Sequence, residues 1–194
     1  LNLQPTVQYR LRIHTSDGKV YFSAFSPNKK TPEIDGIPWE KNSNGVTLFI
    51  NTHDPQNNTL YYQWSYEETW EFHSAYTSFL QYVFHPVTQA PMGITDRDPD
   101  ETWKMFYCWS NERSSNILIG SSVRLERDTI HLPLTLVPMG SEKISVLYSI
   151  LVKQHAISRE NYEFLQRMKK NTEQVGTLFD AQPSELIGNI QCAD

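Results

Sequence analysis

The segment Leu60–His73 constrains the fold more than any other part of this chain. Side chains along a β-strand point alternately to the two faces of a sheet. Most odd positions of the segment are polar, whereas the even positions are almost all aromatic: Tyr62, Trp64, Tyr66, Glu68, Trp70 and Phe72. The alternation predicts one long strand with a buried aromatic face, and therefore a protein built on a β-sheet.

Glu68 is the exception on this aromatic face. A carboxylate on a buried face costs free energy unless it is paired or hydrogen-bonded. Two structural explanations are open: a bulge near Glu67 turns the side chain outward, or an arginine in the core pairs with it. The functional alternative is a polar group set in an aromatic-lined ligand site.

Shorter strands separated by turns are predicted on both sides of this segment. Asp17-Gly18 is a strong hairpin signal, and Pro133, which cannot donate to a ladder, places its strand at an edge or a bulge. Apolar residues on both faces of the last strand favour a central position. The expected strands are Val7–Ile13, Val20–Phe25, Val46–Asn51, Trp103–Trp109, Ile117–Leu125, Thr129–Val137 and Ile144–Gln154.

This pattern predicts a mainly β fold, an antiparallel immunoglobulin- or fibronectin-like β-sandwich with a long insertion and one C-terminal α-helix. The insertion is 74–101, where periodicity is lost, and the helix is 158–175, capped by Ser158 and ended by Gly176. Residues 1–28 are expected to be the closing strands of a preceding immunoglobulin-like domain or an edge hairpin. Residues 33–194 are expected to form the sandwich domain, with an extended tail after the helix.

The aromatic content is high, with ten Tyr, nine Phe and five Trp, and the net charge is −5. The acidic balance argues against a nucleic-acid-binding protein and gives no polybasic attraction to a membrane surface. We expect the aromatic residues of Tyr62–Phe72 and Trp103–Trp109 to be core. The remaining candidate ligand contacts, with Glu68, are the aromatic residues of the insertion: Tyr76, Phe79, Tyr82 and Phe84. The alternative is that these aromatic residues cap the sandwich.

Signatures of catalysis are missing from the sequence. There is no nucleophile elbow, phosphate-binding glycine loop or dinucleotide motif, so a non-enzymatic protein without a cofactor is expected and a hydrolase ranks last. His53 beside Asp54 is a suggestive neighbour pair, although a solvated turn histidine is the simpler interpretation. Asp96, Asp98 and Asp100 alternate as in the first half of a calcium loop, but the glycine and distal glutamate of that loop are not at the required spacing. A solvated acidic turn is the default there.

The two cysteines, Cys108 and Cys192, are far apart in the sequence. In an oxidising compartment they could form a bridge that pins the C-terminal tail to the Cys108 strand. In the cytosol they would be small buried apolar residues. The residues themselves leave both possibilities open.

Several segments, in order and along nearly the whole chain, resemble the domain of unknown function 4249, a family of lipoproteins from Bacteroidota. These segments are Asp17–Lys19 with Tyr21–Ser23, Asn51–Pro55 with Asn57–Asn58, Tyr61–Phe72, Cys108–Trp109, Tyr148–Val152, Lys170–Glu173, Leu178–Ser184 and Gly188–Cys192. The resemblance implies that this chain is the C-terminal two-thirds or so of a protein with a lipidated N-terminus and an immunoglobulin-like first domain.

The resemblance also implies an exported protein, lipid-anchored at the outer membrane and often encoded beside a TonB-dependent transporter. It carries over no catalytic residues, and the exported setting favours a bridge between Cys108 and Cys192. The expected function is capture of an unknown small ligand, glycan or peptide, or service as an accessory protein of such a transporter. A structural or adhesive β-sandwich module without a small ligand is the alternative.

Overall fold

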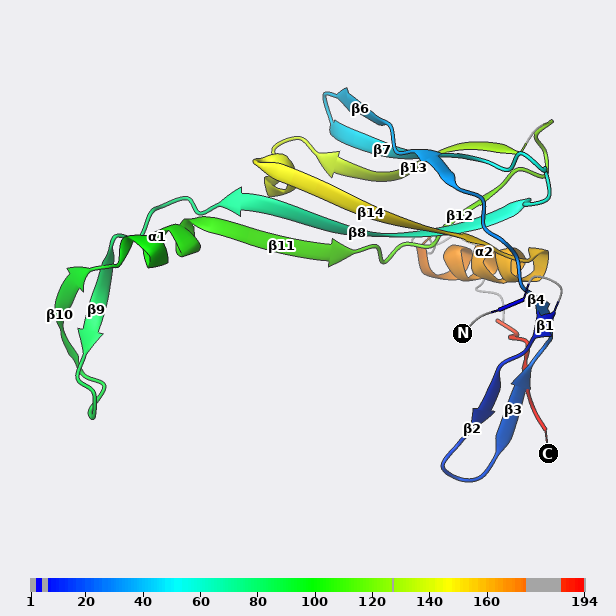
Figure 1. Ribbon diagram of the computed structural model, residues 1–194, viewed down its shortest axis with the longest axis horizontal. Coiled ribbons are helices and arrows are strands. Elements are labelled where there is room, and N and C mark those ends of the chain that lie inside the picture. The colour runs from blue at the N-terminus through cyan, green and yellow to red at the C-terminus, as the bar shows by residue number, and fades with distance from the viewer. Residues whose placement is uncertain (1–2, 5–6, 127, 174–185, 194) are drawn as a thin grey trace, which may run out of the picture.

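The computed structural model describes residues 3–4, 7–126, 128–173 and 186–193. It is mainly β and antiparallel, with a sandwich-like body, as the alternating strands predict. Figure 1 shows an elongated molecule in which a two-stranded hairpin and a small sheet project from the same side of the body, at its two ends. None of the helices in these residues is long and apolar enough to span a membrane.

The long aromatic strand is the centre of the first sheet of the sandwich. This strand, β8 (Tyr61–His73), pairs along one edge with β14 (Leu147–Ala156). Along its other edge it pairs with β11 (Tyr107–Arg113) and then with β12 (Leu118–Ser121). All of these pairings are antiparallel, so β8 is the element that joins the sheet together.

The second sheet is centred on β7 (Gly45–His53), which pairs on one side with β13 (Thr129–Pro138). On its other side β7 pairs with β5 (Ile34–Gly36) and β6 (Trp39–Asn42). The β13 ladder shifts register after Pro133, and β13 is an edge strand. Both observations confirm the expectation from the missing proline donor.

The core lies between these sheets. Its buried side chains are Ile50, Tyr62, Trp64, Ile130 and Leu134, so the even positions of β8 point inward as predicted. The rings of Tyr62 and Trp64 stack with their centroids 5.7 Å apart. Gly120 faces this stack so closely that an added Cβ would lie 2.7 Å from the Trp64 indole. The ring therefore requires glycine at that position of β12.

Two of the predicted strands differ from the structure. The last of the predicted strands corresponds to β14, which among the described strands pairs with β8 alone, so it is an edge strand with alternating burial and not a central one. A 3₁₀ turn, η1 (Glu142–Ile144), precedes it. The segment Trp103–Trp109 begins as a helix, α1 (Pro99–Phe106), and becomes β11 only at Tyr107. Asp98 as N-cap and Pro99 in the first turn start this helix.

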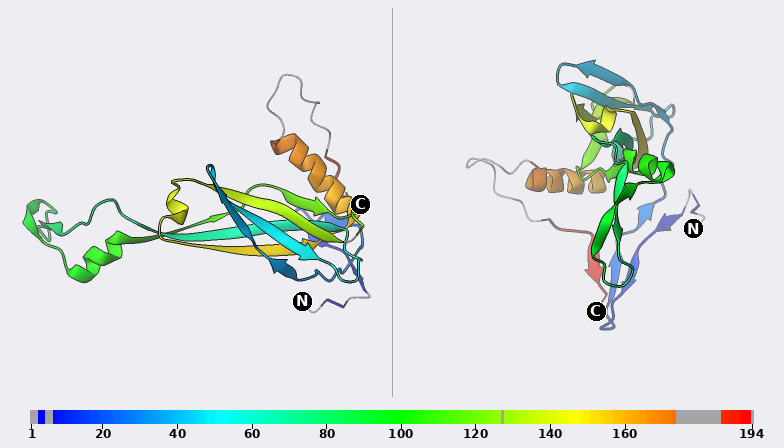
Figure 2. Two further views of the ribbon diagram at one scale, coloured as in Figure 1. Left: turned by 90° about the horizontal axis from the view of Figure 1, so that it is seen from above. Right: turned by 90° about the vertical axis from the view of Figure 1, so that its left-hand side faces the viewer.

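The predicted C-terminal helix is α2 (Arg159–Glu173), beside one end of the sandwich (Figure 2). Ser158 caps it by accepting a hydrogen bond from the Asn161 backbone N–H at 3.2 Å, which confirms the expected start. On its inner side Tyr162 lies 5.1 Å from the ring of Tyr61 in β8. The expected stop, Gly176, lies outside the described residues.

Residues near the N-terminus form two small sheets at this same end of the body. Strand β1 (Gln8–Tyr9) pairs with β4 (Ser26–Pro27). The hairpin of β2 (Arg12–His14) and β3 (Val20–Ser23) turns at Gly18 as predicted, and β3 also pairs with β15 (Ile190–Cys192). The chain therefore returns at its C-terminal end to the N-terminal hairpin. That these strands close a preceding domain stays a prediction.

Candidate functional site

The insertion between β8 and α1 forms a hairpin that extends away from the sandwich. Strand β9 (Leu80–Phe84) pairs with β10 (Pro91–Asp96), and we call residues 78–95, which include the turn between these strands, the distal arm (Figure 1). Phe79, Tyr82 and Phe84 lie in it, and Tyr76 precedes it. The sequence located this segment correctly but did not reveal its hairpin.

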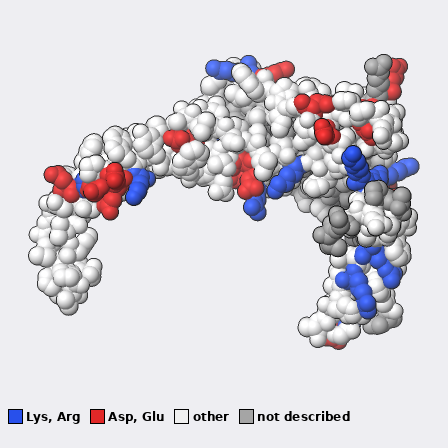
Figure 3. All heavy atoms as spheres, in the orientation of Figure 1, with Lys and Arg blue, Asp and Glu red and all other residues white. Residues whose placement is uncertain are grey.

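The distal arm is apolar, uncharged and exposed. Residues 75–95 contain no Asp, Glu, Lys or Arg, and Figure 3 shows a projecting tip free of charged groups. Tyr82 is 62% exposed, and other large apolar side chains are also exposed: Tyr76, Phe79, Leu80, Val83, Phe84, Val87, Met92 and Ile94. The aromatic residues therefore do not cap the sandwich. Contiguous exposed apolar surface on a globular protein marks an interaction site.

The pairing register concentrates this apolar character on one face of the distal arm. Leu80, Tyr82 and Phe84 alternate along β9 and so point to the same side, and Ile94 stands opposite Tyr82 across the ladder. The rings of Tyr82 and Phe84 are 6.1 Å apart. The other face is mixed, with the polar Gln81 and Thr95 beside the apolar Val83 and Phe79.

The base of the distal arm is acidic. Figure 3 shows negative side chains gathered where the distal arm meets the body, and we call the carboxylates in this stretch the acidic collar: Asp96, Asp98, Asp100 and Glu101. Arg97, which lies among them in the sequence, donates to the carbonyls of Ser78 and Leu80, each at 3.2 Å.

The collar does not have the geometry of a calcium loop. Asp98 is the N-cap of α1, and its carboxylate accepts the Asp100 N–H at 2.8 Å. No group of three or more His, Cys, Asp or Glu in the described part of the chain could hold a metal ion. The aspartates therefore lie at the start of a helix, whereas the sequence analysis placed them in a solvated acidic turn and began its strand at Trp103.

Exposed aromatic surface continues from the distal arm over α1 and the first residues of β11. Trp103, Phe106 and Tyr107 contact one another with ring centroids 5.3–6.0 Å apart, and His73 packs on this cluster. Trp103 and Tyr107 are about half exposed, and Trp109 is 58% exposed. The prediction that the Trp103–Trp109 aromatic residues are core is therefore wrong, because no second layer covers this end of β8 and β11.

Glu68 is buried without a bulge, since β8 keeps continuous register with β11 and β14. Its carboxylate accepts hydrogen bonds from Lys143 Nζ and from the Tyr148 hydroxyl, both at 2.6 Å. Burial and the Glu68 carboxylate raise the pKa of Tyr148. The partner is thus a lysine and not the expected arginine, and the buried Glu68 carboxylate is satisfied by Lys143 and Tyr148.

Lys143 connects this buried carboxylate to the surface. Its ammonium also contacts Glu112 at 2.7 Å and lies 4.9 Å from the Trp70 ring centroid. Burial alone would lower the pKa of Lys143, but the hydrogen bonds to Glu112 and Glu68 raise it overall. The group fixes the turn η1 against β8 and β11 with paired charges.

The expected disulfide is not formed. Cys108 and Cys192 are both free thiols. Cys108 is the second residue of β11, at the end of the sandwich that carries the distal arm, whereas Cys192 pairs with Tyr21 in the small sheet at the other end of the molecule (Figure 1). The length of the sandwich separates them, which sequence distance could not show.

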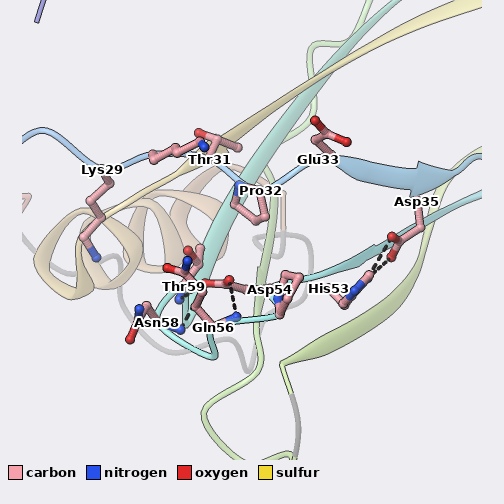
Figure 4. A pocket seen from close by; sticks show the side chains of 12 residues that line it. Lys29, Thr31, Pro32, Glu33, Asp35, His53, Asp54, Gln56, Asn58 and Thr59 are labelled. Carbon is pink, nitrogen blue, oxygen red and sulfur yellow. Dashed lines mark hydrogen bonds and ion pairs between the residues drawn. The ribbon is translucent and has the colours of Figure 1, made fainter. Parts of the chain in front are cut away.

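A pocket of about 560 Å³ lies between the segment 29–35 and the loop 53–59 (Figure 4). His53 Nδ1 contacts both carboxylate oxygens of Asp35, at 2.7 and 2.8 Å. The hydrogen bond with Asp35 raises the pKa of His53. Among the described residues, no hydroxyl or thiol is hydrogen-bonded to this imidazole, and its carboxylate partner is Asp35.

The neighbouring Asp54, which the sequence placed beside His53, has a structural role. Its carboxylate accepts backbone N–H groups of Gln56, Asn58 and Thr59 at 2.8–3.0 Å. Burial opposes ionisation of Asp54, but these hydrogen bonds lower its pKa overall. The carboxylate therefore shapes the loop, and the true partner of His53 comes from β5, a strand that sequence reasoning missed.

Comparison with known proteins gives a family but no activity. The family model named domain of unknown function (DUF4249) matches residues 1–194, which is the whole chain. A search of curated proteins and a search of solved structures each gave no match. The chain, with its sandwich, its uncharged distal arm and its acidic collar, therefore belongs to the DUF4249 family.

Proposed function

We propose that this chain is part of a non-enzymatic, exported accessory protein that docks onto another protein through its distal arm. The observation that carries the proposal is the apolar face formed by Leu80, Tyr82, Phe84 and Ile94 in a segment, 75–95, that has no charged residues. Burying such a face against a partner is favourable by roughly 25 cal/mol per Å² of apolar area. Aromatic residues are also the commonest anchors of protein interfaces.

A protein fits the distal arm better than a lipid bilayer does. A two-stranded hairpin has two open edges whose backbone groups need hydrogen-bond partners, and the hydrocarbon region of a membrane offers none. The acidic collar at the base of the distal arm would also be repelled by anionic lipid. A protein surface can satisfy both the apolar side chains and the backbone.

The resemblance to Bacteroidota lipoproteins suggests the partner and the location. In this proposal the complete protein is lipid-anchored at the outer membrane, and the distal arm contacts a TonB-dependent transporter. The distal arm and the N-terminal sheet project from the same side of the body, so both could face one large partner (Figure 1). Ligand delivery to the transporter would follow from this docking.

Co-purification with the transporter encoded beside the gene tests the proposal. The full-length tagged protein is compared with a Tyr82→Ser, Ile94→Ser double variant, which removes the centre of the apolar face. Trp39→Ser is the matched control, because Trp39 is 65% exposed but lies on β6 in the sandwich. We expect capture to fall at least about tenfold for the double variant, equivalent to about 1.4 kcal/mol, and to persist for the control.

Equal capture by the double variant would contradict docking through the distal arm. If the unmodified protein captures no transporter, the structural or adhesive alternative is the better description of the chain.

A further inference from the structure

We infer that the partner of the distal arm adds a β-strand to the outer edge of β9, and that this strand carries basic side chains at the end nearest the acidic collar. The inference rests on the proposed docking function and specifies how the docking occurs. Strand addition supplies affinity through backbone hydrogen bonds and specificity through alternate side chains.

The hydrogen bonds at the two ends of β9 define which backbone groups are free. The Arg97 N–H donates to the Phe79 carbonyl at 2.7 Å, and the His85 N–H donates to the Ala90 carbonyl at 2.9 Å. The backbone groups of Phe79 and His85 therefore point toward β10, as do those of Gln81 and Val83 between them. In an antiparallel pair the alternate residues direct N–H and C=O away from the ladder, so those of Tyr82 and Phe84 face outward.

The available part of this edge is the half nearest the tip. At the base, the Leu80 carbonyl already accepts from the Arg97 guanidinium. Beyond it, Tyr82 and Phe84 present two N–H donors and two carbonyl acceptors with no charged side chain beside them. An unprotected neutral edge of this kind is a template for another strand.

The opposite edge, along β10, has features that discourage pairing. Pro91 stands opposite Phe84, at a position whose N–H would face outward, and proline has no N–H to donate. The register also shifts between Pro91 and Gly93, and Asp96 ends the strand with a charge. Bulges, prolines and charges are the usual protections of an edge strand. Within 80–84, β9 has no proline, bulge or charged side chain of its own, and the Arg97 guanidinium occupies only the Leu80 carbonyl. The edge at Tyr82 and Phe84 is therefore the one left open for a partner.

The surrounding charges indicate the chemistry of the incoming strand. Its apolar residues would continue the face of Leu80, Tyr82 and Phe84, and Lys or Arg at its base-side end would lie near the acidic collar. A second copy of this chain fits less well. Parallel pairing of two β9 strands would bring two acidic collars together, and antiparallel pairing would set each collar beside an uncharged tip.

The first measurement uses designed peptides of alternating valine and threonine as probes of the full chain. One peptide carries lysines at its N-terminal end and a second carries them at its C-terminal end, so that both strand directions are sampled. A third peptide carries glutamates in place of the lysines. By NMR hydrogen exchange we expect the lysine peptides to slow exchange of the Tyr82 and Phe84 amides. The amides of Gln81 and Val83 should change little, because they already face β10. The glutamate peptide should bind at least about tenfold more weakly.

The second measurement separates backbone pairing from side-chain contact. Tyr82→Val keeps the outward N–H, whereas Tyr82→Pro removes it, and proline is tolerated where an edge N–H faces solvent. We expect Tyr82→Pro to bind the lysine peptide at least about tenfold more weakly than Tyr82→Val. The matched control on the β10 edge compares Ile94→Pro with Ile94→Val, and these two variants should bind the lysine peptide equally well, because the outward N–H of Ile94 lies on the edge that the peptide does not use. Unchanged exchange at Gln81 and Val83 shows that the hairpin of each variant is intact.

Several results would overturn the inference while leaving the docking function standing. Equal binding by Tyr82→Val and Tyr82→Pro would mean side-chain contact only, and no binding of any peptide would remove strand addition altogether. A dimer that Tyr82→Pro dissociates would assign the edge to a second copy, and uptake by anionic vesicles would assign the distal arm to lipid. Transporter capture that does not depend on the distal arm would overturn the docking function as well.

Discussion

The strands β8 and β9 carry similar aromatic alternation, but the aromatic side chains are buried in β8 and exposed in β9. Tyr62 and Trp64 of β8 are buried, whereas Tyr82 and Phe84 of β9 are more than half exposed. The difference is the second layer: the β7 sheet covers β8, and no described element covers the distal arm. Aromatic alternation thus identifies a strand and its apolar face, but a core forms only where another sheet buries that face.

The largest expected contrast between the two regions is in the stability of aromatic truncations. Trp64→Ala should lower the free energy of unfolding by about 3–5 kcal/mol, because it removes a buried ring and leaves a cavity. Tyr82→Ala should change it by no more than about 0.5 kcal/mol. Urea unfolding of both variants measures this. A comparable loss for Tyr82→Ala would mean that the distal arm contributes to the core.

Loss of an ion pair should show the same contrast between buried and exposed positions. Lys143→Met leaves the buried Glu68 carboxylate with only the Tyr148 hydroxyl, and we expect a loss of about 2–3 kcal/mol. Arg113→Met removes an exposed pair with Glu67 on the same sheet and should cost less than about 1 kcal/mol. The difference is measured from the denaturant midpoints of the two variants, provided that the slope of unfolding free energy against denaturant is the same for both. Equal costs would mean that burial is not what makes the Glu68 pair important.

Glycine substitutions give a smaller and more local contrast. Gly120→Ala places a methyl group 2.7 Å from Trp64 and Leu132 side-chain atoms, so we expect a loss of about 1–3 kcal/mol from overpacking. Gly93→Ala meets no atom within 4 Å in the distal arm and should be neutral or slightly stabilising. Thermal unfolding distinguishes the two. A destabilising Gly93→Ala would indicate a neighbour that covers the distal arm.

The smallest expected effect is the pH dependence of the pair between β5 and β7. Asp35 raises the pKa of His53 in the folded protein, so the pair stabilises fully below the unfolded histidine pKa of about 6.5 and its contribution fades as pH rises through the higher folded pKa. Both groups are exposed, so the change in melting temperature should be slight. Asp35→Asn should remove this pH dependence of the melting temperature. An unchanged His53 NMR titration in that variant would contradict the pairing.

The sequence predicted local structure well where one residue pattern controls it. The strand Leu60–His73, the Gly18 turn, the Ser158 cap and the irregularity at Pro133 are all present in the structure. Each depends on neighbouring residues alone, through side-chain alternation, a turn glycine, a capping hydroxyl or a missing N–H. The start of α1 was missed because the aromatic run after Trp103 outweighed the capping signal at Asp98.

By itself, the sequence determined the β class, the place of the insertion and which residues are apolar, because these depend on composition and on spacing along one strand. Only the tertiary structure decided the rest. It paired Glu68 with Lys143 and His53 with Asp35, separated Cys108 from Cys192, and left β9 uncovered. These outcomes depend on which segments meet across the fold, and that depends on how the layers pack, which spacing along one strand does not record.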